Sequence, residues 1–142
     1  MTINENQYQI IEEFGVYTDW MEKYAYLIEL GNSLAPLDDK EKVPENLIKG
    51  CQSRVWLDAQ LKDGRIVLNA DSDAILTKGL IYMLIKVLSN HTPDEIINAN
   101  LYFIDKVGLK EHLSPTRSNG LLAMVKQIKM YALAFRSKVY SN

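Results

Sequence analysis

The chain is 142 residues long, with 47% hydrophobic and 24% charged residues, a composition typical of a globular protein that is long enough for one domain with a real core. Its 16 lysines and arginines and 18 aspartates and glutamates give a net charge of -2 with no block of like charge, which argues against nucleic acid and anionic membranes as partners. The N-terminus lacks the basic and apolar regions of a signal peptide, and no stretch is apolar for long enough to span a membrane. We therefore expect a cytoplasmic protein with a single domain over residues 1–142.

Two helices are predicted before residue 33. The first covers residues 8–14. The second starts after Thr18 or Asp19, whose side-chain oxygens can cap its first turn, and it ends at Gly31, in the position of a C-terminal cap. The second helix is amphipathic, because large apolar residues recur on one of its faces: Trp20, Tyr24, Leu27 and Ile28.

A loop and a β-hairpin follow. Residues 33–45 combine two prolines with several charges and no periodicity, which predicts a surface loop, and residues 46–49 form a brief extended piece. Residues 55–61 alternate between apolar and polar side chains, as a strand with one buried face does. The Asp-Gly pair at residues 63–64 predicts a tight turn, and the alternation resumes over residues 66–70.

The next element is predicted to be a helix over residues 74–88 that is buried on most sides, because few of its side chains are polar. Asp71, Ser72 and Asp73 offer oxygens that can cap its first turn. Gly79 lies inside this helix, where a glycine costs about 1 kcal/mol relative to alanine. This cost is offset only where another backbone must approach the helix closely.

Three more helices are predicted toward the C-terminus. A Thr-Pro pair at residues 92–93 starts a short helix through Asn98, residues 102–107 form another, and a Ser-Pro pair at residues 114–115 starts a long last helix. The apolar residues of the last helix are spaced for one buried face: Leu121, Val125, Ile128, Ala132 and Phe135. The elements together predict an α+β fold in which a small antiparallel sheet packs against helices.

Cys51 is the only cysteine, so the chain has neither an intramolecular disulfide nor a zinc site built from several thiolates, and it suits a reducing compartment. It lies between Gly50 and the polar pair Gln52-Ser53, just before a predicted strand, where the backbone is flexible and the side chain can be reached. A lone cysteine is also commonly a small, buried and inert hydrophobic residue. The residues alone leave a reactive thiol and an inert core cysteine as alternatives.

Arg117 breaks a local rule, because it places a positive charge in the first turn of the last helix, where the helix dipole is already positive. Exceptions of this kind mark either a functional site or a local partner. We therefore consider two roles for Arg117: one beside the Cys51 thiol, and one in a structural ion pair with Asp71 or Asp73.

Several stretches, taken together, resemble the SufE family of sulfur-acceptor proteins. The similarity runs in order from about residue 14 to residue 130, and it is carried by DWMEKYAYLIELG (residues 19–31), GCQSRVW (50–56), DSDA (71–74) followed by KGL (78–80), and HLSPTRSNGL (112–121). The resemblance implies a SufE/IscU-like fold without the metal ligands of the IscU scaffold. It also implies that Cys51 receives sulfane sulfur as a persulfide, supported by Gly50, Gln52, Asp73 and Arg117.

The same resemblance implies the partners. They are a cysteine desulfurase of the SufS type, whose activity the protein would stimulate, and a SufB-containing scaffold complex for iron-sulfur cluster assembly, to which the sulfur passes. Pyridoxal phosphate belongs to the desulfurase, so we expect neither a cofactor nor a metal on this chain, and no independent enzymatic turnover. The CsdE family shares these motifs and serves a CsdA-type desulfurase, so the choice between the two partners stays open, as does a homodimer.

The implied mechanism is attack of the Cys51 thiolate on the terminal sulfur of the desulfurase persulfide. A lower thiol pKa gives only a small net gain, because nucleophilicity falls with it, whereas orientation effects can be far larger. We therefore expect loop geometry around Gly50 and Gln52, rather than a strongly shifted pKa, to make Cys51 competent. A second hypothesis is that nearby apolar side chains shelter the sulfur until the partner docks, namely Leu47, Ile48, Val55 and Trp56.

Two alternatives belong to other functional classes. A cysteine hydrolase needs a base beside its thiol, and His91 and His112 are weak candidates for bases or metal ligands because both lie in loop contexts without a recognisable partner. An interaction module with an inert Cys51 is the other alternative. Direct scaffolding of an iron-sulfur cluster is disfavoured, because one thiol per chain cannot hold a cluster alone.

Overall fold

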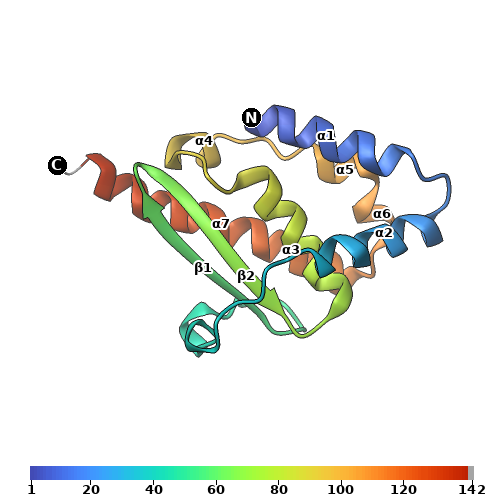
Figure 1. The fold of residues 1–142 in the computed structure, drawn as a ribbon, viewed down its shortest axis with the longest axis horizontal. Helices are drawn as coiled ribbons and strands as arrows, with labels where there is room; N and C mark the ends of the chain where they lie inside the picture. The colour runs from blue at the N-terminus through green and yellow to red at the C-terminus, as the bar shows by residue number, and fades with distance from the viewer. Residues whose placement is uncertain (141–142) are drawn as a thin grey trace.

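A computed structural model describes the backbone of residues 1–140 and the side chains of residues 1–138; residues 141 and 142 of the expected domain lie outside it. The fold is α+β, with one two-stranded antiparallel sheet among helices in the described residues, as predicted (Figure 1). The elements in chain order are α1 (Ile3–Gly15), α2 (Trp20–Asn32), the short 3-10 turns η1 (Asp39–Glu41) and η2 (Pro44–Asn46), β1 (Val55–Lys62), β2 (Arg65–Ser72), α3 (Ile75–Leu88), α4 (Pro93–Ile97), α5 (Phe103–Val107), α6 (Leu109–His112) and α7 (Pro115–Tyr140).

The hairpin has the predicted register and turn. Val55 pairs with Ser72 at one end and Lys62 with Arg65 at the other. Asp63 and Gly64 have φ angles of 52° and 77°, the two positive values that a type I′ turn requires. One face of the hairpin is buried, because its alternating apolar residues point into the core: Val55, Leu57, Ile66, Leu68 and Ala70.

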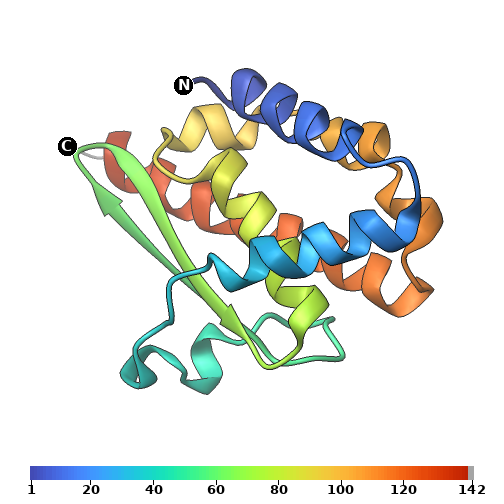
Figure 2. The ribbon, with the colours of Figure 1, turned by 45° about the vertical axis from the view of Figure 1, so that its right-hand side comes forward.

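Helix α3 lies at the centre of the core and packs against both β2 and α2 (Figures 1 and 2). The contact with α2 is close because Gly79 has no side chain: a Cβ there would lie 2.9 Å from Cδ1 of Leu27 and well inside contact distance of the Leu27 carbonyl oxygen. Another backbone thus approaches Gly79 closely, the condition under which the sequence allowed for a glycine inside this helix. Gly31 faces the same contact from inside α2, so its predicted role as a C-terminal cap is wrong.

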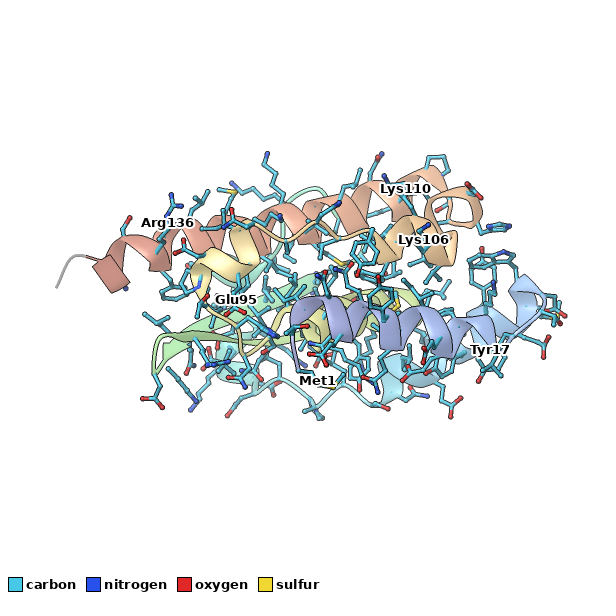
Figure 3. All side chains as sticks on the ribbon, turned by 90° about the horizontal axis from the view of Figure 1, so that it is seen from above. Met1, Tyr17, Glu95, Lys106, Lys110 and Arg136 are labelled. Carbon is cyan, nitrogen blue, oxygen red and sulfur yellow. The ribbon has the colours of Figure 1, made fainter. Side chains whose placement is uncertain are left out.

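Helix α7 runs along the molecule behind α3 and also packs against α4, while α1 packs against α5 and α3. Seen from above, α1 and α7 run in opposite directions, with Met1 near the start of α1 and Arg136 near the end of α7 (Figure 3). The first helix begins earlier than predicted, at Ile3, because Thr2 and Glu5 form a capping box that fixes its first turn. No helix in residues 1–140 is both long and apolar enough to cross a membrane.

The segment between α2 and β1 forms the predicted loop, with η1 and η2 as its only helical turns in the described residues. The expected extended piece at residues 46–49 is confirmed only in part: Leu47 forms an isolated bridge with Trp56, whereas Asn46 belongs to η2 and Lys49 lies in a turn. Asp71 fastens this loop to the sheet: its carboxylate lies 3.3 Å from Lys42 Nζ and accepts a hydrogen bond from the Leu37 N–H at 3.4 Å. Asp71 is therefore a loop anchor, and the predicted role of Asp71 as a helix cap is wrong.

The start of α3 is capped differently from the prediction. Ala74 is the residue before the helix, and none of its own side-chain atoms can accept a hydrogen bond. The hydroxyl of Ser72 accepts a hydrogen bond from the Ala74 N–H at 3.2 Å, whereas Asp73 binds the backbone of Arg54 instead. Of the three predicted capping residues, only Ser72 supports the beginning of α3.

Candidate functional site

Cys51 lies on a short loop whose base is closed by hydrogen bonds. Before the loop, the Ile48 N–H donates to the Val55 carbonyl at 2.9 Å. After it, the Arg54 N–H donates to the Asp73 carboxylate at 3.0 Å, and the Ser72 hydroxyl donates to the Arg54 carbonyl at 2.8 Å. These hydrogen bonds hold both ends of the loop to the hairpin.

Gly50 gives the loop its turn toward α7. Its φ angle is +95°, in the region that residues with a side chain rarely adopt. A Cβ at this position would also lie 3.2 Å from the Cβ of Ala123 on α7, which is tighter than ordinary packing. The predicted importance of Gly50 therefore has a structural basis in its backbone conformation.

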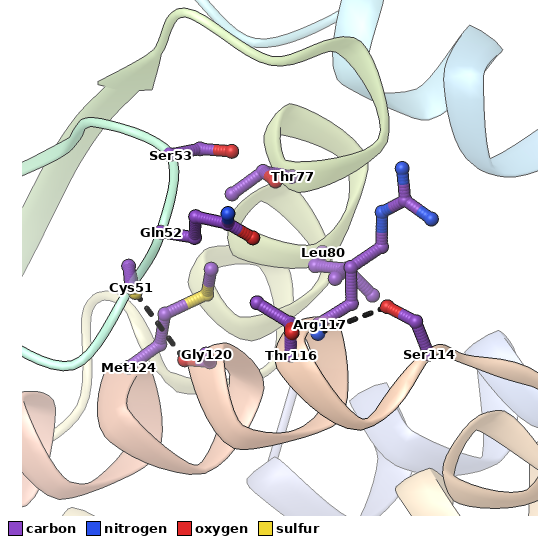
Figure 4. Close-up of a pocket in the computed structure, with 10 residues that line it drawn as sticks. All are labelled: Cys51, Gln52, Ser53, Thr77, Leu80, Ser114, Thr116, Arg117, Gly120 and Met124. Carbon is purple, nitrogen blue, oxygen red and sulfur yellow. Dashed lines mark hydrogen bonds between the residues drawn. The ribbon is translucent and has the colours of Figure 1, made fainter.

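The Cys51 side chain is half-buried and lies against the first turns of α7. Its Sγ is 3.6 Å from the Gly120 carbonyl oxygen, within range of a weak hydrogen bond from the thiol (Figure 4). A cavity of about 200 Å³ opens beside the sulfur, between the loop, α3 and α7. It is lined by Cys51, Gln52, Ser53, Thr77, Leu80, Ser114, Thr116, Arg117, Gly120 and Met124.

Burial raises the pKa of the Cys51 thiol above its ordinary value, because the surroundings disfavour the charged thiolate. The hydrogen bond to the Gly120 carbonyl acts in the same direction, since only the protonated thiol can donate it. The resting thiol is thus held in its protonated form. Nothing in this arrangement lowers the pKa of Cys51, in agreement with the expectation that a lowered pKa is not what makes it competent.

Arg117 lines the same cavity but does not contact the thiol. Its backbone N–H is capped by the Ser114 hydroxyl at 3.2 Å, which confirms the predicted Ser-Pro start of α7. Figure 4 shows its guanidinium directed away from Cys51. Within residues 1–140 it forms no ion pair within 4 Å, so the predicted pairing with Asp71 or Asp73 is wrong.

The other two predicted site residues occupy different places. Gln52 follows Cys51 into the cavity wall and is exposed. Asp73 does not line the cavity. It acts at a distance from the sulfur, because its carboxylate holds the Arg54 N–H and so fixes the C-terminal end of the loop.

Neither histidine lies in the cavity that holds the thiol. His91 is buried, and its two ring nitrogens face backbone carbonyls, among them that of Met1 at 3.0 Å. His112 is exposed and stacks on Trp20 with 3.9 Å between ring centroids. The structure therefore gives Cys51 no histidine base of the kind that a cysteine hydrolase needs.

The residues around the Cys51 sulfur are not the ones that were expected to shelter it. Val55 and Ile48 belong to the buried core, and Leu47 and Trp56 line a separate hollow with Lys42, Pro44 and Arg54. The walls around Cys51 come instead from α3 and α7, and the residues that sequence reasoning missed are Ser53, Thr77, Leu80, Ser114, Thr116, Gly120 and Met124. Sequence signals were available only for those at the start of α7, namely the Ser-Pro helix start at residues 114–115 and the Asn-Gly pair at residues 119–120.

Comparison with known proteins places the chain in a family. The family model described as "SufE: Fe-S metabolism associated domain" matches residues 8–132. The chain therefore belongs to the SufE family and is associated with iron-sulfur metabolism. In fold it is similar to the solution structure of a hypothetical protein from Thermus thermophilus, with a TM-score of 0.74 and 19% sequence identity over 91% of this chain and 94% of that one.

Proposed function

We propose that this protein accepts sulfane sulfur from a SufS-type cysteine desulfurase onto Cys51, stimulates that desulfurase, and passes the sulfur to a SufB-containing scaffold. Membership in the SufE family supports a role in iron-sulfur metabolism. The observation that carries the proposal is the position of the thiol: it is half-buried beside an open cavity and lies on a loop whose two ends are held by hydrogen bonds.

In the proposed reaction the Cys51 thiolate attacks the terminal sulfur of a persulfide on the desulfurase. A new S–S bond forms to Cys51, the S–S bond of the desulfurase persulfide breaks, and the desulfurase cysteine leaves as a thiolate with the electron pair. The proton on the transferred sulfur stays with it, and because one S–S bond replaces another, no external oxidant or reductant is needed. Pyridoxal phosphate acts on the desulfurase, where the sulfur is first released from cysteine.

The surroundings of the Cys51 thiol in the free protein affect when the thiolate needed for this reaction is present. Because burial raises the pKa of Cys51 and its thiol donates to the Gly120 carbonyl, the free protein holds little thiolate at neutral pH. In this proposal, docking of the desulfurase draws the loop out of the cavity, and the thiolate forms in the interface. The fixed ends at Ile48 and Arg54 confine that movement to the loop itself.

The test is incubation with a SufS-type desulfurase, pyridoxal phosphate and cysteine, followed by intact-mass measurement. We expect the wild type to gain the mass of one or more sulfur atoms, and this gain to be removed by a reductant. The Cys51→Ser variant should gain nothing and keep the wild-type melting temperature, because the side chain is nearly isosteric and only half-buried. Sulfur uptake by Cys51→Ser, or none by the wild type, would refute the proposal.

The same assay decides which desulfurase is served. A SufS-type and a CsdA-type enzyme are compared at equal activity, and the faster loading of Cys51 identifies the partner. Acyl-substrate hydrolysis measured in parallel tests the hydrolase alternative, for which no histidine lies in the cavity.

A further inference from the structure

Gly120 lies directly beneath the Cys51 sulfur, in the second turn of α7. A Cβ built on Gly120 would have one neighbour outside the helix within 4 Å, the Cys51 Sγ at 3.6 Å. This is an ordinary van der Waals distance, so an alanine would fit beside the resting thiol. Gly120 differs in this respect from Gly79, where a neighbouring backbone leaves no room for a side chain.

The resting structure therefore does not explain why position 120 is a glycine. Glycine inside a helix costs about 1 kcal/mol relative to alanine, because it loses more backbone freedom on folding. Gly120 lies in a helical segment and has no positive φ angle. A helix position that tolerates alanine but carries glycine indicates that the space is needed in another state of the protein.

A persulfide on Cys51 is such a state. The added sulfur lies about 2.05 Å from Sγ, and it needs about 3.5 Å of clearance from a carbon atom. With a Cβ 3.6 Å from Sγ, any terminal sulfur pointing within about 70° of that carbon would be too close. The cavity into which the terminal sulfur can point is lined by Gly120 and, one turn later, by Met124 (Figure 4).

We propose that the absent side chain of Gly120 provides the place for the terminal sulfur of the Cys51 persulfide in the free protein. Gly120 is then a positioning residue for sulfur storage, distinct from the residues that form the persulfide. This inference rests on the proposed function, because it concerns the protein after it has received sulfur. In a Gly120→Ala variant the terminal sulfur turns out of the cavity and toward solvent.

Cyanide tests this directly, because it attacks the terminal sulfur of a persulfide and gives thiocyanate and a free thiol. The wild type and Gly120→Ala are loaded by a SufS-type desulfurase, separated from it, and treated with cyanide. We expect Gly120→Ala to release thiocyanate about tenfold faster, which corresponds to a barrier lower by about 1.4 kcal/mol. Thiocyanate release is expressed per loaded persulfide, counted by intact mass before cyanide is added, so that a difference in loading does not enter the comparison.

Asn119→Ala is the matched control. Asn119 is exposed in the same turn and does not line the cavity, so its replacement raises helix propensity without changing the space around the sulfur. It should release thiocyanate at the wild-type rate. Both variants should melt at or above the wild-type temperature.

Each outcome decides the inference. Equal cyanide reactivity of Gly120→Ala and wild type overturns it, and so does an equal acceleration in Asn119→Ala. A lower melting temperature of unloaded Gly120→Ala also overturns it, because the Cβ would then conflict with the resting thiol. If the wild type takes up no sulfur, the proposed function itself fails, and this result differs from every outcome that concerns Gly120 alone.

Discussion

Arg117 is an exposed cation at the rim of the cavity, and its guanidinium has no ion-pair partner within 4 Å in the described chain. Its charge is unfavourable at the N-terminal end of α7. A side chain that costs stability and has no local partner is available for charge-assisted hydrogen bonds to the docked desulfurase or to the moving loop. We therefore propose that Arg117 contributes to sulfur transfer rather than to folding.

We expect Arg117→Ala to slow sulfur transfer to Cys51 about tenfold, the effect of losing one charge-assisted hydrogen bond of about 1–2 kcal/mol in the transition state. Its melting temperature should equal or slightly exceed that of the wild type. Single-turnover transfer followed by intact mass gives the rate. Lys126→Ala, which removes an exposed cation of α7 that does not line the cavity, should transfer sulfur normally. A large loss of stability in Arg117→Ala would instead indicate a structural role.

At the same scale, the sequence pointed to Cys51 as the candidate reactive residue but not to the residues that surround it. Three residues stood out in the sequence because each departs from its local context. Cys51 is the only cysteine, Gly50 is the glycine beside it, and Arg117 is a cation at the positive end of a helix. Leu80 and Met124 carried no such signal, because their helical spacing is that of any core residue. Which core residues border a cavity depends on how two helices and a loop meet, and this is not encoded in the periodicity of either helix.

At the scale of elements, the contact between α2 and α3 is set by a missing side chain. Gly79→Ala places a Cβ against the Leu27 carbonyl and 2.9 Å from the Leu27 Cδ1, so the two helices must separate. Overpacking of this kind costs about 1–3 kcal/mol or more, and it outweighs the gain of about 1 kcal/mol in helix propensity. Because the Cβ would meet backbone that cannot turn aside, we take the upper cost of about 3 kcal/mol and expect a net loss of about 2 kcal/mol in the free energy of unfolding, measured by urea denaturation.

Gly15→Ala is the matched control for this change. It lies at the end of α1, its φ angle is not positive, and a Cβ there meets nothing within 4 Å. This variant should be as stable as the wild type or slightly more stable. A Gly79→Ala protein of wild-type stability would show that α2 and α3 can move apart at no cost.

The elements themselves were largely predictable, and the errors have physical causes. The hairpin, α3 and α7 follow from alternation, an Asp-Gly turn and a Ser-Pro start. The early start of α1 was missed because it depends on the Thr2–Glu5 capping box rather than on apolar spacing. Gly31 was misassigned because the sequence does not distinguish a glycine that ends a helix from one that lies where two helices touch. Only the structure, in which Gly31 faces Gly79 of α3, shows that it has the second role.

At the scale of the whole molecule, Asp71 joins the loop on both sides of η1 to the sheet and to α3. Its side chain is almost fully buried, with Lys42 Nζ at 3.3 Å on the loop and Lys78 Nζ at 3.6 Å on α3. Its carboxylate also accepts the N–H groups of Ser72 and Leu37. One carboxylate thus holds together the segment that leads to the Cys51 loop and the helix that lines its cavity.

This arrangement predicts acid sensitivity. Burial acts to raise the pKa of Asp71, but the hydrogen bonds from Ser72 and Leu37 and the charges of Lys42 and Lys78 outweigh it, so the net pKa is below the ordinary value. A carboxyl group with a lowered folded-state pKa stabilises the protein above its unfolded-state pKa of about 3.9. That stability is lost as the pH falls from there through the folded-state pKa.

The pKa values of Glu5 and Glu95 are also lowered, so their effect on acid stability must be separated from that of Asp71. The backbone hydrogen bond from Thr2 lowers the pKa of Glu5, and that from Thr92 lowers the pKa of Glu95, in each case with help from the hydroxyl of the same threonine. Acid unfolding of the wild type therefore contains several contributions. The quantity that isolates Asp71 is the stability difference between the wild type and Asp71→Asn at each pH.

We expect Asp71→Asn to be less stable than the wild type by about 1–3 kcal/mol at pH 7, the cost of replacing a hydrogen-bonded, buried carboxylate whose partners stay in place. The difference should stay constant above about pH 5 and shrink as the pH falls below about 4, because the wild type then loses the charge that the variant never had. Urea denaturation between these pH values measures it. Asp105→Asn, which breaks the exposed ion pair with Lys110, should change stability by less than about 1 kcal/mol at any pH. If the difference between wild type and Asp71→Asn is independent of pH, the carboxylate is not the group that fastens the loop, and the anchor of the Cys51 segment must lie elsewhere.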